Sequence, residues 1–161
     1  MMNRALKIQF QVAVSAADFE LGKRLFRTYA EGLGFDLSFQ QFDQELEQVD
    51  QMYSPPEGML LIVNAEEEVA IGCFGLRPLE AGICELKRMY LHANYRGMGI
   101  GRKMMEEAFR QARKIGYEKM RLDTLDRMKP AIALYENYGF YEIPSYRYNP
   151  MTGVLYFEKV L

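Results

Sequence analysis

The feature that most constrains the fold of this chain is a glycine-rich junction between a strand-like segment and a helix-like one. Residues 83–92 have the pattern of a strand, and Arg96-Gly97-Met98-Gly99-Ile100-Gly101 follows shortly after them. From there apolar residues recur at helical spacing to residue 115, and Gly116 stands where a helix ends. Residues 119–124 are again strand-like. This order predicts a strand–helix–strand unit with a right-handed crossover between two parallel strands.

The first half of the chain predicts helices and an antiparallel meander. Helix-start signals lie at Ser15 with Asp18 and at Ser38 with Gln41. Strand-like runs occupy residues 7–14, 59–64, 69–77 and 83–92, and a helix from Pro130 to Gly139 precedes a last strand at 154–161. We therefore predict an α/β (α+β) fold with a mixed central sheet. Its N-terminal strands are antiparallel, its strands 4 and 5 are parallel, and about four helices flank it.

Composition favours a single domain over residues 1–161. Of the 161 residues, 49% are hydrophobic and 13% aromatic, and no repeat or linker divides the chain. Two cysteines and one histidine exclude a disulfide scaffold and the usual zinc sites, so no metal is expected. No apolar run approaches the ~20 residues of a membrane span, and the N-terminus lacks the pattern of a signal peptide. We expect a cytoplasmic protein with no membrane partner, in which Cys73 and Cys84 are free thiols on neighbouring strands.

The net charge of −2 hides an asymmetry between the two halves. Residues 1–80 carry 6 Lys and Arg against 13 Asp and Glu, a net charge of −7, whereas residues 81–161 carry 14 against 9, a net charge of +5. A basic second half fits a polyanionic partner, either nucleic acid or a phosphorylated small molecule. Most lysines of this half also fit a solvated helix face, but Arg96 beside the glycines does not.

The glycine-rich junction has the properties of a pyrophosphate-binding loop. Glycines let backbone N–H groups converge on an anion, the start of the helix adds about half a positive charge, and Arg96 adds a full one. The P-loop pattern is excluded because it requires Gly-Lys-Ser/Thr. The dinucleotide pattern needs a glycine where Arg102 stands, although Asp123 imitates its ribose-binding acid. A nicotinamide-dependent oxidoreductase is therefore disfavoured.

Two motifs together resemble the GNAT superfamily of N-acetyltransferases. Arg96-Gly97-Met98-Gly99-Ile100-Gly101 matches the R/Q-x-x-G-x-G/A signature of the loop that holds the pyrophosphate of acetyl-coenzyme A. Residues 131–140, Ala-Ile-Ala-Leu-Tyr-Glu-Asn-Tyr-Gly-Phe, match the family's A-x-x-L-Y-x-x-x-G-F segment. The resemblance implies a GNAT-like sheet whose strands 4 and 5 splay apart, with acetyl-CoA as the cofactor.

The resemblance assigns cofactor contacts to two segments. The pyrophosphate would lie against Arg96, Gly97, Met98, Gly99, Ile100, Gly101 and Arg102. The strand of residues 83–92 would present unpaired backbone groups to the pantetheine arm, at Met89, Tyr90 and Leu91. Among these groups, the Met89 N–H is the expected donor to the oxyanion of acetyl transfer. Core packing of the Met89 and Leu91 side chains is compatible with this role, because the contacts would use backbone atoms.

The resemblance also assigns two catalytic side chains. Tyr135 matches the family tyrosine that protonates the coenzyme A thiolate, and its ordinary pKa of about 10 keeps it protonated at neutral pH. Glu85 lies four residues before Met89 and is expected on the same face, where it would take the amine proton directly or through water. A salt bridge of Glu85 with Lys87 or Arg88 is an equally open interpretation. Asp123 is a second candidate base.

These residues predict an acetyl-CoA-dependent N-acetyltransferase that acts by direct transfer on a primary amine of a small molecule or on an exposed amino group. The alternative is a CoA-binding regulatory module without catalysis. Nucleic-acid binding is not expected, because no known reading module is present and the first half is acidic. Residues 30–55 and 143–153 should frame the acceptor, and the acids of the first range would suit a cationic amine. A homodimer is left open.

Overall fold

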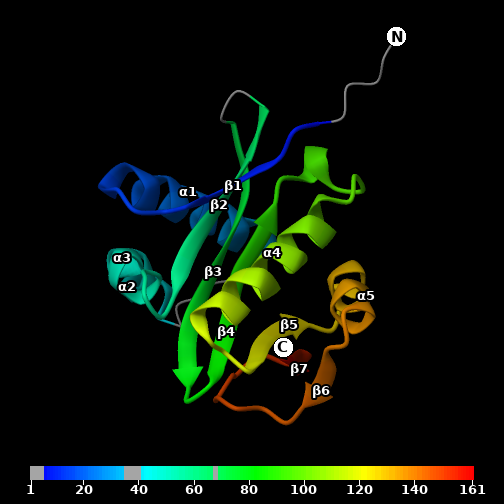
Figure 1. Ribbon diagram of the computed structural model, residues 1–161. Helices are drawn as coiled ribbons and strands as arrows, with labels where there is room; N and C mark the ends of the chain where they lie inside the picture. Colours follow the sequence, from blue (N-terminus) through cyan, green and yellow to red (C-terminus); the bar gives the residue numbers. More distant parts are fainter. Residues whose placement is uncertain (1–5, 35–40, 67–68) are drawn as a thin grey trace.

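A mixed seven-stranded sheet forms the centre of the part of the chain that the computed structural model describes, residues 6–34, 41–66 and 69–161 (Figure 1). The strands are β1 (Gln9–Val12), β2 (Met59–Ala65), β3 (Val69–Glu80), β4 (Ile83–Leu91), β5 (Lys119–Leu125), β6 (Tyr141–Ile143) and β7 (Val154–Val160). They lie in the order β1-β2-β3-β4-β5-β7-β6, with β4 and β5 parallel and the other neighbours antiparallel. The predicted mixed sheet is confirmed.

Helices cover both faces of this sheet (Figure 1). They are α1 (Ala16–Leu33), α2 (Phe42–Glu47), α3 (Val49–Met52), α4 (Ile100–Ile115) and α5 (Lys129–Asn137), and a 3-10 turn, η3 (Ala93–Tyr95), follows β4. The described residues thus contain five α-helices where about four were expected. None of the helices in these ranges is long and apolar enough to cross a membrane.

The first helix begins where the sequence predicts, whereas the second differs. Ser15 Oγ accepts the Asp18 N–H at 3.1 Å and the Asp18 carboxylate accepts the Ser15 N–H at 3.1 Å, which completes a capping box before α1. The predicted start at Ser38 lies outside the described residues. Within them, α2 begins after Gln41, whose φ is 56°, and the chain breaks at Gln48 before α3. One predicted helix is therefore two short ones.

Two apolar cores lie on the two faces of the sheet. The core under α4 and α5 contains Leu61, Phe74, Met104, Met105 and Phe157, among others. The core under α1, α2 and α3 contains Phe26, Tyr53, Leu60 and Ile62. Because strand side chains alternate between faces, consecutive apolar residues of β2 supply both cores.

The short strand β6 was not predicted, and it directs the chain back toward the centre of the sheet. With three residues it is too short to show a period-two pattern. It pairs with β7 at the sheet edge. The segment between them, residues 144–153, then reaches β4 through Tyr146 and Arg147. We call this connection the β6–β7 segment.

Candidate functional site

The candidate site lies where β4 and β5 separate. Their pairing comprises Ile83 with Lys119, Cys84 with Met120 and Glu85 with Arg121. Beyond these pairs β4 continues to Leu91 and β5 to Leu125 without further pairing between them. Backbone groups on the two facing edges therefore lack a strand partner, and such an edge can pair with an extended ligand. The predicted splay of strands 4 and 5 is present.

A bulge in β4 decides which side chains point to which face. Arg88 has a φ of 56°, a left-handed conformation that is uncommon for a non-glycine residue, and the register with β3 shifts at this point. Before the bulge, Cys84 and Leu86 belong to the core under α4, so Glu85 between them points to the opposite face. After the bulge, Met89 packs against that same α4 core. The expectation that Glu85 and Met89 share a face is wrong, because the bulge inverts the alternation.

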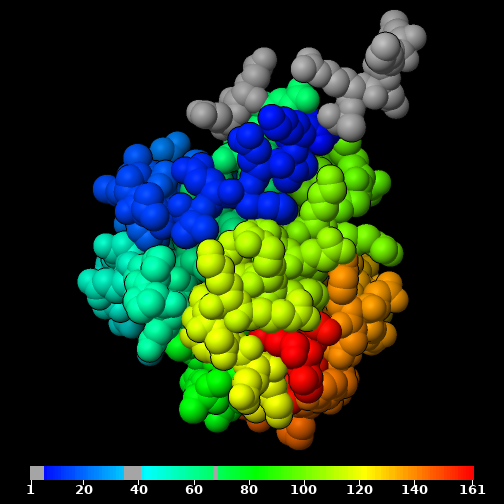
Figure 2. All heavy atoms as spheres, in the orientation of Figure 1, coloured from blue at the N-terminus to red at the C-terminus, as the bar shows by residue number. Residues whose placement is uncertain are grey.

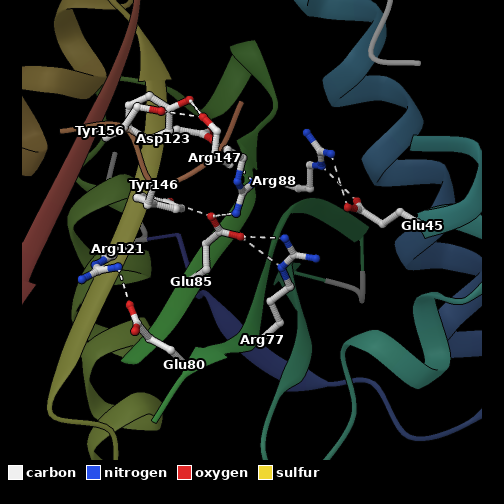
Figure 3. Close-up of polar contacts among 11 residues, drawn as sticks. Glu45, Arg77, Glu80, Glu85, Arg88, Arg121, Asp123, Tyr146, Arg147 and Tyr156 are labelled. Atoms are coloured by element: carbon white, nitrogen blue, oxygen red, sulfur yellow. Dashed lines mark hydrogen bonds and ion pairs between the residues drawn. The ribbon is translucent and has the colours of Figure 1, made fainter. Parts of the chain in front are cut away.

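The carboxylate of Glu85 joins three segments at the point of separation (Figure 3). Its side chain is fully buried, with 0% exposed. Oε1 accepts a hydrogen bond from Nε of Arg77 on β3 at 3.0 Å, and Nη2 of the same guanidinium lies 2.9 Å from it in an ion pair. Oε2 accepts from the Tyr146 hydroxyl at 2.6 Å and from the Arg147 guanidinium. Both oxygens are engaged, and they tie β3 and the β6–β7 segment to β4.

Nearby cations determine the protonation state of Glu85. Burial by itself raises the pKa of this carboxyl, but the charges of Lys87, Arg147 and Arg77 outweigh it and lower the pKa to about 2. The group is therefore ionised at neutral pH and a weak proton acceptor. Its engaged oxygens and low pKa favour a positioning role over the role of base that the resemblance implied.

A second buried ion pair holds α2 against the bulge. Arg88 pairs with Glu45, at 3.0 Å from Nε to Oε2 and 3.3 Å from Nη2 to Oε1, and both side chains are at least 95% buried. The guanidinium also lies 5.1 Å from the centre of the Phe42 ring. Arg88 is therefore not a partner of Glu85, and the salt bridges of Glu85 involve Arg77 and Arg147 instead.

Asp123 of β5 approaches the same cluster from the other side of the opening. Its Oδ2 lies 3.6 Å from Arg147 Nη1, which is an ion pair but too long for a hydrogen bond. Among the described residues, this buried oxygen has no hydrogen-bond donor. Because buried carboxylate oxygens usually have donors, Asp123 has capacity left for a ligand.

Tyr135 lies on α5, which begins with Pro130 in its first turn as predicted. Its ring packs edge-on against Phe140, with 5.8 Å between ring centres. Burial raises the pKa of Tyr135, and nearby Tyr29 and Asp123 raise it further, so the hydroxyl is protonated at neutral pH. The described part of the chain offers this hydroxyl no hydrogen-bond partner.

The glycine-rich loop joins η3 to α4 at the surface. Gly97 and Gly99 have φ values of 77° and 80°, which explains glycine at both positions. Arg96 is exposed, and its Nε donates to the Leu91 carbonyl at 2.9 Å, so its side chain is held at the end of β4. The side chain of Ile100 is buried, so this residue could contact a ligand only through its backbone N–H.

A cavity of about 390 Å³ opens beside the Glu85 cluster, between α2, β3, β4 and the β6–β7 segment. Residues 30–55 and 143–153, the two ranges expected to frame an acceptor, both contribute to the lining of this cavity. Of the acids expected to attract a cationic acceptor, Glu45 lines this cavity but is paired with Arg88. Four others are exposed outside its lining, namely Glu31, Asp43, Glu47 and Asp50, and Asp36 lies outside the described residues.

The two cysteines are free thiols as predicted, but they lie on opposite faces of the sheet. Cys73 donates to the Arg88 carbonyl and Cys84 to the Lys119 carbonyl, each at 3.6 Å. Burial raises the pKa of Cys84 to about 12 and raises that of Cys73 as well. Neither thiol is ionised at neutral pH, so neither is suited to act as a nucleophile.

Comparison with known proteins identifies the family. Residues 22–140 match the model of the acetyltransferase (GNAT) family. The chain belongs to the GNAT family. An uncharacterized N-acetyltransferase of Schizosaccharomyces pombe is 37% identical to this GNAT protein over 140 residues, which cover 86% of each chain.

Solved GNAT structures share the fold. An acetyltransferase of the GNAT family from Staphylococcus aureus Mu50 aligns with a TM-score of 0.78 and 18% identity, over 96% of this chain and 99% of that one. A GNAT acetyltransferase from Elizabethkingia anophelis with acetyl-CoA bound aligns with a TM-score of 0.65 and 19% identity, over 99% of this chain and 100% of that one. The family and its relatives show that the chain is an N-acetyltransferase.

Three residues of the candidate site were not singled out from the sequence. Arg77 ends a predicted strand, and Tyr146 and Arg147 follow a strand that the sequence did not reveal. The sequence contains only an indirect signal for these residues, namely that a buried acid on β4 requires compensating cations. The cations nearest to it in sequence, Lys87 and Arg88, are not the ones that form ion pairs with it.

Replacing Glu85 with Gln should lower the free energy of unfolding by about 2–4 kcal/mol at pH 7, because Arg77 and Arg147 would lose a buried counter-charge. These arginine side chains are 25% and 23% exposed, so solvent moderates the loss. The pKa of Glu85 is about 2 in the folded state against an ordinary 4.5. Its contribution is therefore complete above pH 4.5 and disappears as the pH falls toward 2.

Urea denaturation at pH 7 and pH 3 measures this difference, which should shrink at pH 3 to about half or less. The control is Glu20→Gln, which removes an exposed ion pair with Lys23 at 3.0 Å and should change stability by less than about 0.5 kcal/mol. Equal effects of the two substitutions at pH 7 would contradict the account of Glu85.

Proposed function

We propose that this N-acetyltransferase uses acetyl-CoA and that residues 1–161 act as one domain, transferring the acetyl group directly to a primary amine of a small molecule or to an exposed amino group. The proposal is carried by the uncapped, glycine-rich start of α4 beside the opening between β4 and β5. Acetyl-CoA would supply the activated thioester. The acetyl-CoA bound to the Elizabethkingia anophelis relative supports this cofactor.

The start of α4 fits a pyrophosphate. Its N-cap residue, Gly99, has no side chain to accept the free N–H groups, and the first turn contains no acid. Arg102 and Lys103 stand in that turn, where the helix dipole disfavours cations unless an anion binds there. An anion would satisfy the N–H groups and both cations. We assign the pyrophosphate to Arg96, Gly97, Met98, Gly99, Ile100, Gly101 and Arg102.

The part of β4 beyond the bulge fits the extended arm of the cofactor. Met89, Tyr90 and Leu91 lie past the last pair with β5, so that edge of the strand has no neighbour. We assign the pantetheine arm to these three residues. The Met89 N–H would donate to the carbonyl oxygen of the acetyl group and stabilise the charge that develops there.

Two proton transfers accompany the formation of the N–C bond and the breaking of the C–S bond. Tyr135 is protonated and its hydroxyl has no hydrogen-bond partner among the described residues, so it would give its proton to the departing sulfur. For the amine proton the contacts favour Asp123, whose Oδ2 lacks a donor, over Glu85, whose two oxygens are engaged. Asp123 would act directly or through water, and Glu85 would hold Arg147 in place beside it.

Reversing the charge of Arg96 should weaken the binding of acetyl-CoA. We expect Arg96→Glu to raise the dissociation constant about 10- to 100-fold in calorimetry, because a carboxylate would replace a cation beside the pyrophosphate. Arg24→Glu makes the same change on the exposed surface of α1 and should leave the constant unchanged. Absence of acetyl-CoA binding by the wild type, or equal affinities of all three proteins, would exclude the proposed cofactor site.

Removing the hydroxyl of Tyr135 should slow turnover without affecting cofactor binding. We expect Tyr135→Phe to lower kcat about 10²-fold, the usual contribution of a general acid, in an assay of free-thiol release with a panel of amines. Tyr138→Phe is the matched control three residues further on, since that hydroxyl donates to Glu106 at 2.9 Å outside the opening. Cofactor binding with no turnover on any amine would instead favour a regulatory module.

A further inference from the structure

A nearly buried lysine that makes no direct polar contact with the described residues lies in the cavity beside the Glu85 cluster. Lys87 is 5% exposed and lines the cavity of about 390 Å³. No described residue accepts a hydrogen bond from its Nζ or forms an ion pair with it. Buried ammonium groups are normally paired, because desolvation of the charge is costly. A missing anionic partner would explain this exception.

The charges around Lys87 do not cancel. The charged groups around it are Glu45 of α2, Arg77 of β3, Glu85 and Arg88 of β4, Asp123 of β5, and Arg147 of the β6–β7 segment. Together with Lys87 they comprise four cations and three carboxylates. Each carboxylate has an arginine within ion-pair distance, as Figure 3 shows for Glu45 with Arg88 and for Glu85 with Arg77, and only Asp123 keeps an oxygen without a hydrogen-bond donor among the described residues. The charges of Glu85 and Asp123 act on Lys87 from a distance, but Lys87 is the one of these four cations that forms no ion pair with a described residue, and one positive charge remains in excess.

The rest of the lining can also receive an anion. The guanidinium groups of Arg77 and Arg147 are partly exposed and have N–H groups beyond those given to Glu85. The remaining polar side chains of the cavity are neutral amides and a phenol, including Gln44, Gln48 and Asn149. Its volume suits a small molecule. The cavity therefore offers one buried ammonium, two arginine edges and no unpaired acid of its own.

The position of Lys87 relates the cavity to the transfer site. Lys87 and Asp123 each lie two residues past the last β4–β5 pair, Glu85 with Arg121, and their side chains point to the same face. Asp123 Oδ2 is the buried oxygen without a hydrogen-bond donor. An unpaired cation and an unsatisfied carboxylate thus lie across one opening. Lys87 is complementary to an anionic group, and Asp123 is complementary to an amine, of one small ligand.

We propose that the acceptor is a small amine that also carries a carboxylate, as an amino acid does, and that Lys87 binds this carboxylate with help from Arg77 and Arg147. This inference rests on the proposed function, since it names the substrate of the same site. It replaces the cationic acceptor that the acidic first half suggested, because the cavity itself is lined by cations.

The test measures dissociation constants by calorimetry with the wild-type protein saturated with CoA. The probes are amino acids paired with their α-carboxamides, which keep the amine and side chain but remove the anionic group. We expect at least one amino acid to bind about 10- to 100-fold more tightly than its amide. Lys87→Met should abolish that preference, and Lys114→Met, on the exposed surface of α4, should preserve it.

The outcomes separate this inference from the proposed function. Equal affinity for both members of every pair, including no binding of either, overturns the carboxylate site. So does a preference that survives Lys87→Met. If acetyl-CoA binds and the amides are acetylated as fast as the acids, the acceptor assignment fails while the acetyltransferase function stands. Failure of acetyl-CoA to bind would contradict the proposed function instead.

A measurement on the wild-type protein avoids dependence on any variant. Burial, followed by the charge of Arg88, lowers the pKa of Lys87 to about 8, whereas a bound carboxylate favours the charged ammonium. NMR titration of the labelled lysine Nζ should show a higher pKa with the preferred amino acid than without it. Affinity should correspondingly fall as the pH rises above 8. An unchanged or lower pKa in the complex overturns the proposal.

Discussion

The buried carboxylate of Glu85 holds together the segments that meet where β4 and β5 part. Arg77 from β3 and Arg147 from the β6–β7 segment would repel each other if they approached this point without a shared anion. With both oxygens engaged, Glu85 fixes two guanidinium groups that are themselves partly open to the cavity. The same anion that stabilises the sheet thus positions the cations that line the cavity.

The opening itself depends on backbone geometry. Beyond Glu85 the two parallel strands no longer pair, and the bulge at Arg88 turns Met89 toward the α4 core while Lys87 stays on the other face. The left-handed conformation of Arg88 is unfavourable by itself, and its buried ion pair with Glu45 compensates by anchoring α2 to the bulge. The space-filling view shows α4 and α5 adjoining at the surface (Figure 2), so the proposed sites of the pyrophosphate and of the proton donor Tyr135 lie on neighbouring helices.

The sequence predicted those parts of the fold that local patterns encode. The capping box of Ser15, the apolar stripe of α4 and the parallel β4–β5 pair follow from spacing and caps, and all are present. The bulge at Arg88 could not be predicted, because nothing in its residue type favours a positive φ, and it reversed the inferred relation between Glu85 and Met89.

The electrostatics of the site also depended on tertiary structure. Glu85 takes its partners from residues that are remote in sequence, including Tyr146 and Arg147, 61 and 62 positions away. The acids of the first half suggested a negative acceptor site, yet the described ones are mostly on the surface, and Glu45 is neutralised by Arg88. Counting charges by segment therefore predicted the wrong sign for the cavity, whose unpaired charge is positive, because the partners of each charge are set by the tertiary structure.

The most direct test of the account is amide hydrogen exchange with and without acetyl-CoA, read residue by residue. If the cofactor occupies the start of α4 and the opening beside β4, exchange should slow at residues 89–91 and 97–102 and remain unchanged at the opposite sheet edge, Gln9–Val12. Protection confined to other parts of the chain, or no protection in either segment at saturating cofactor, would contradict the account.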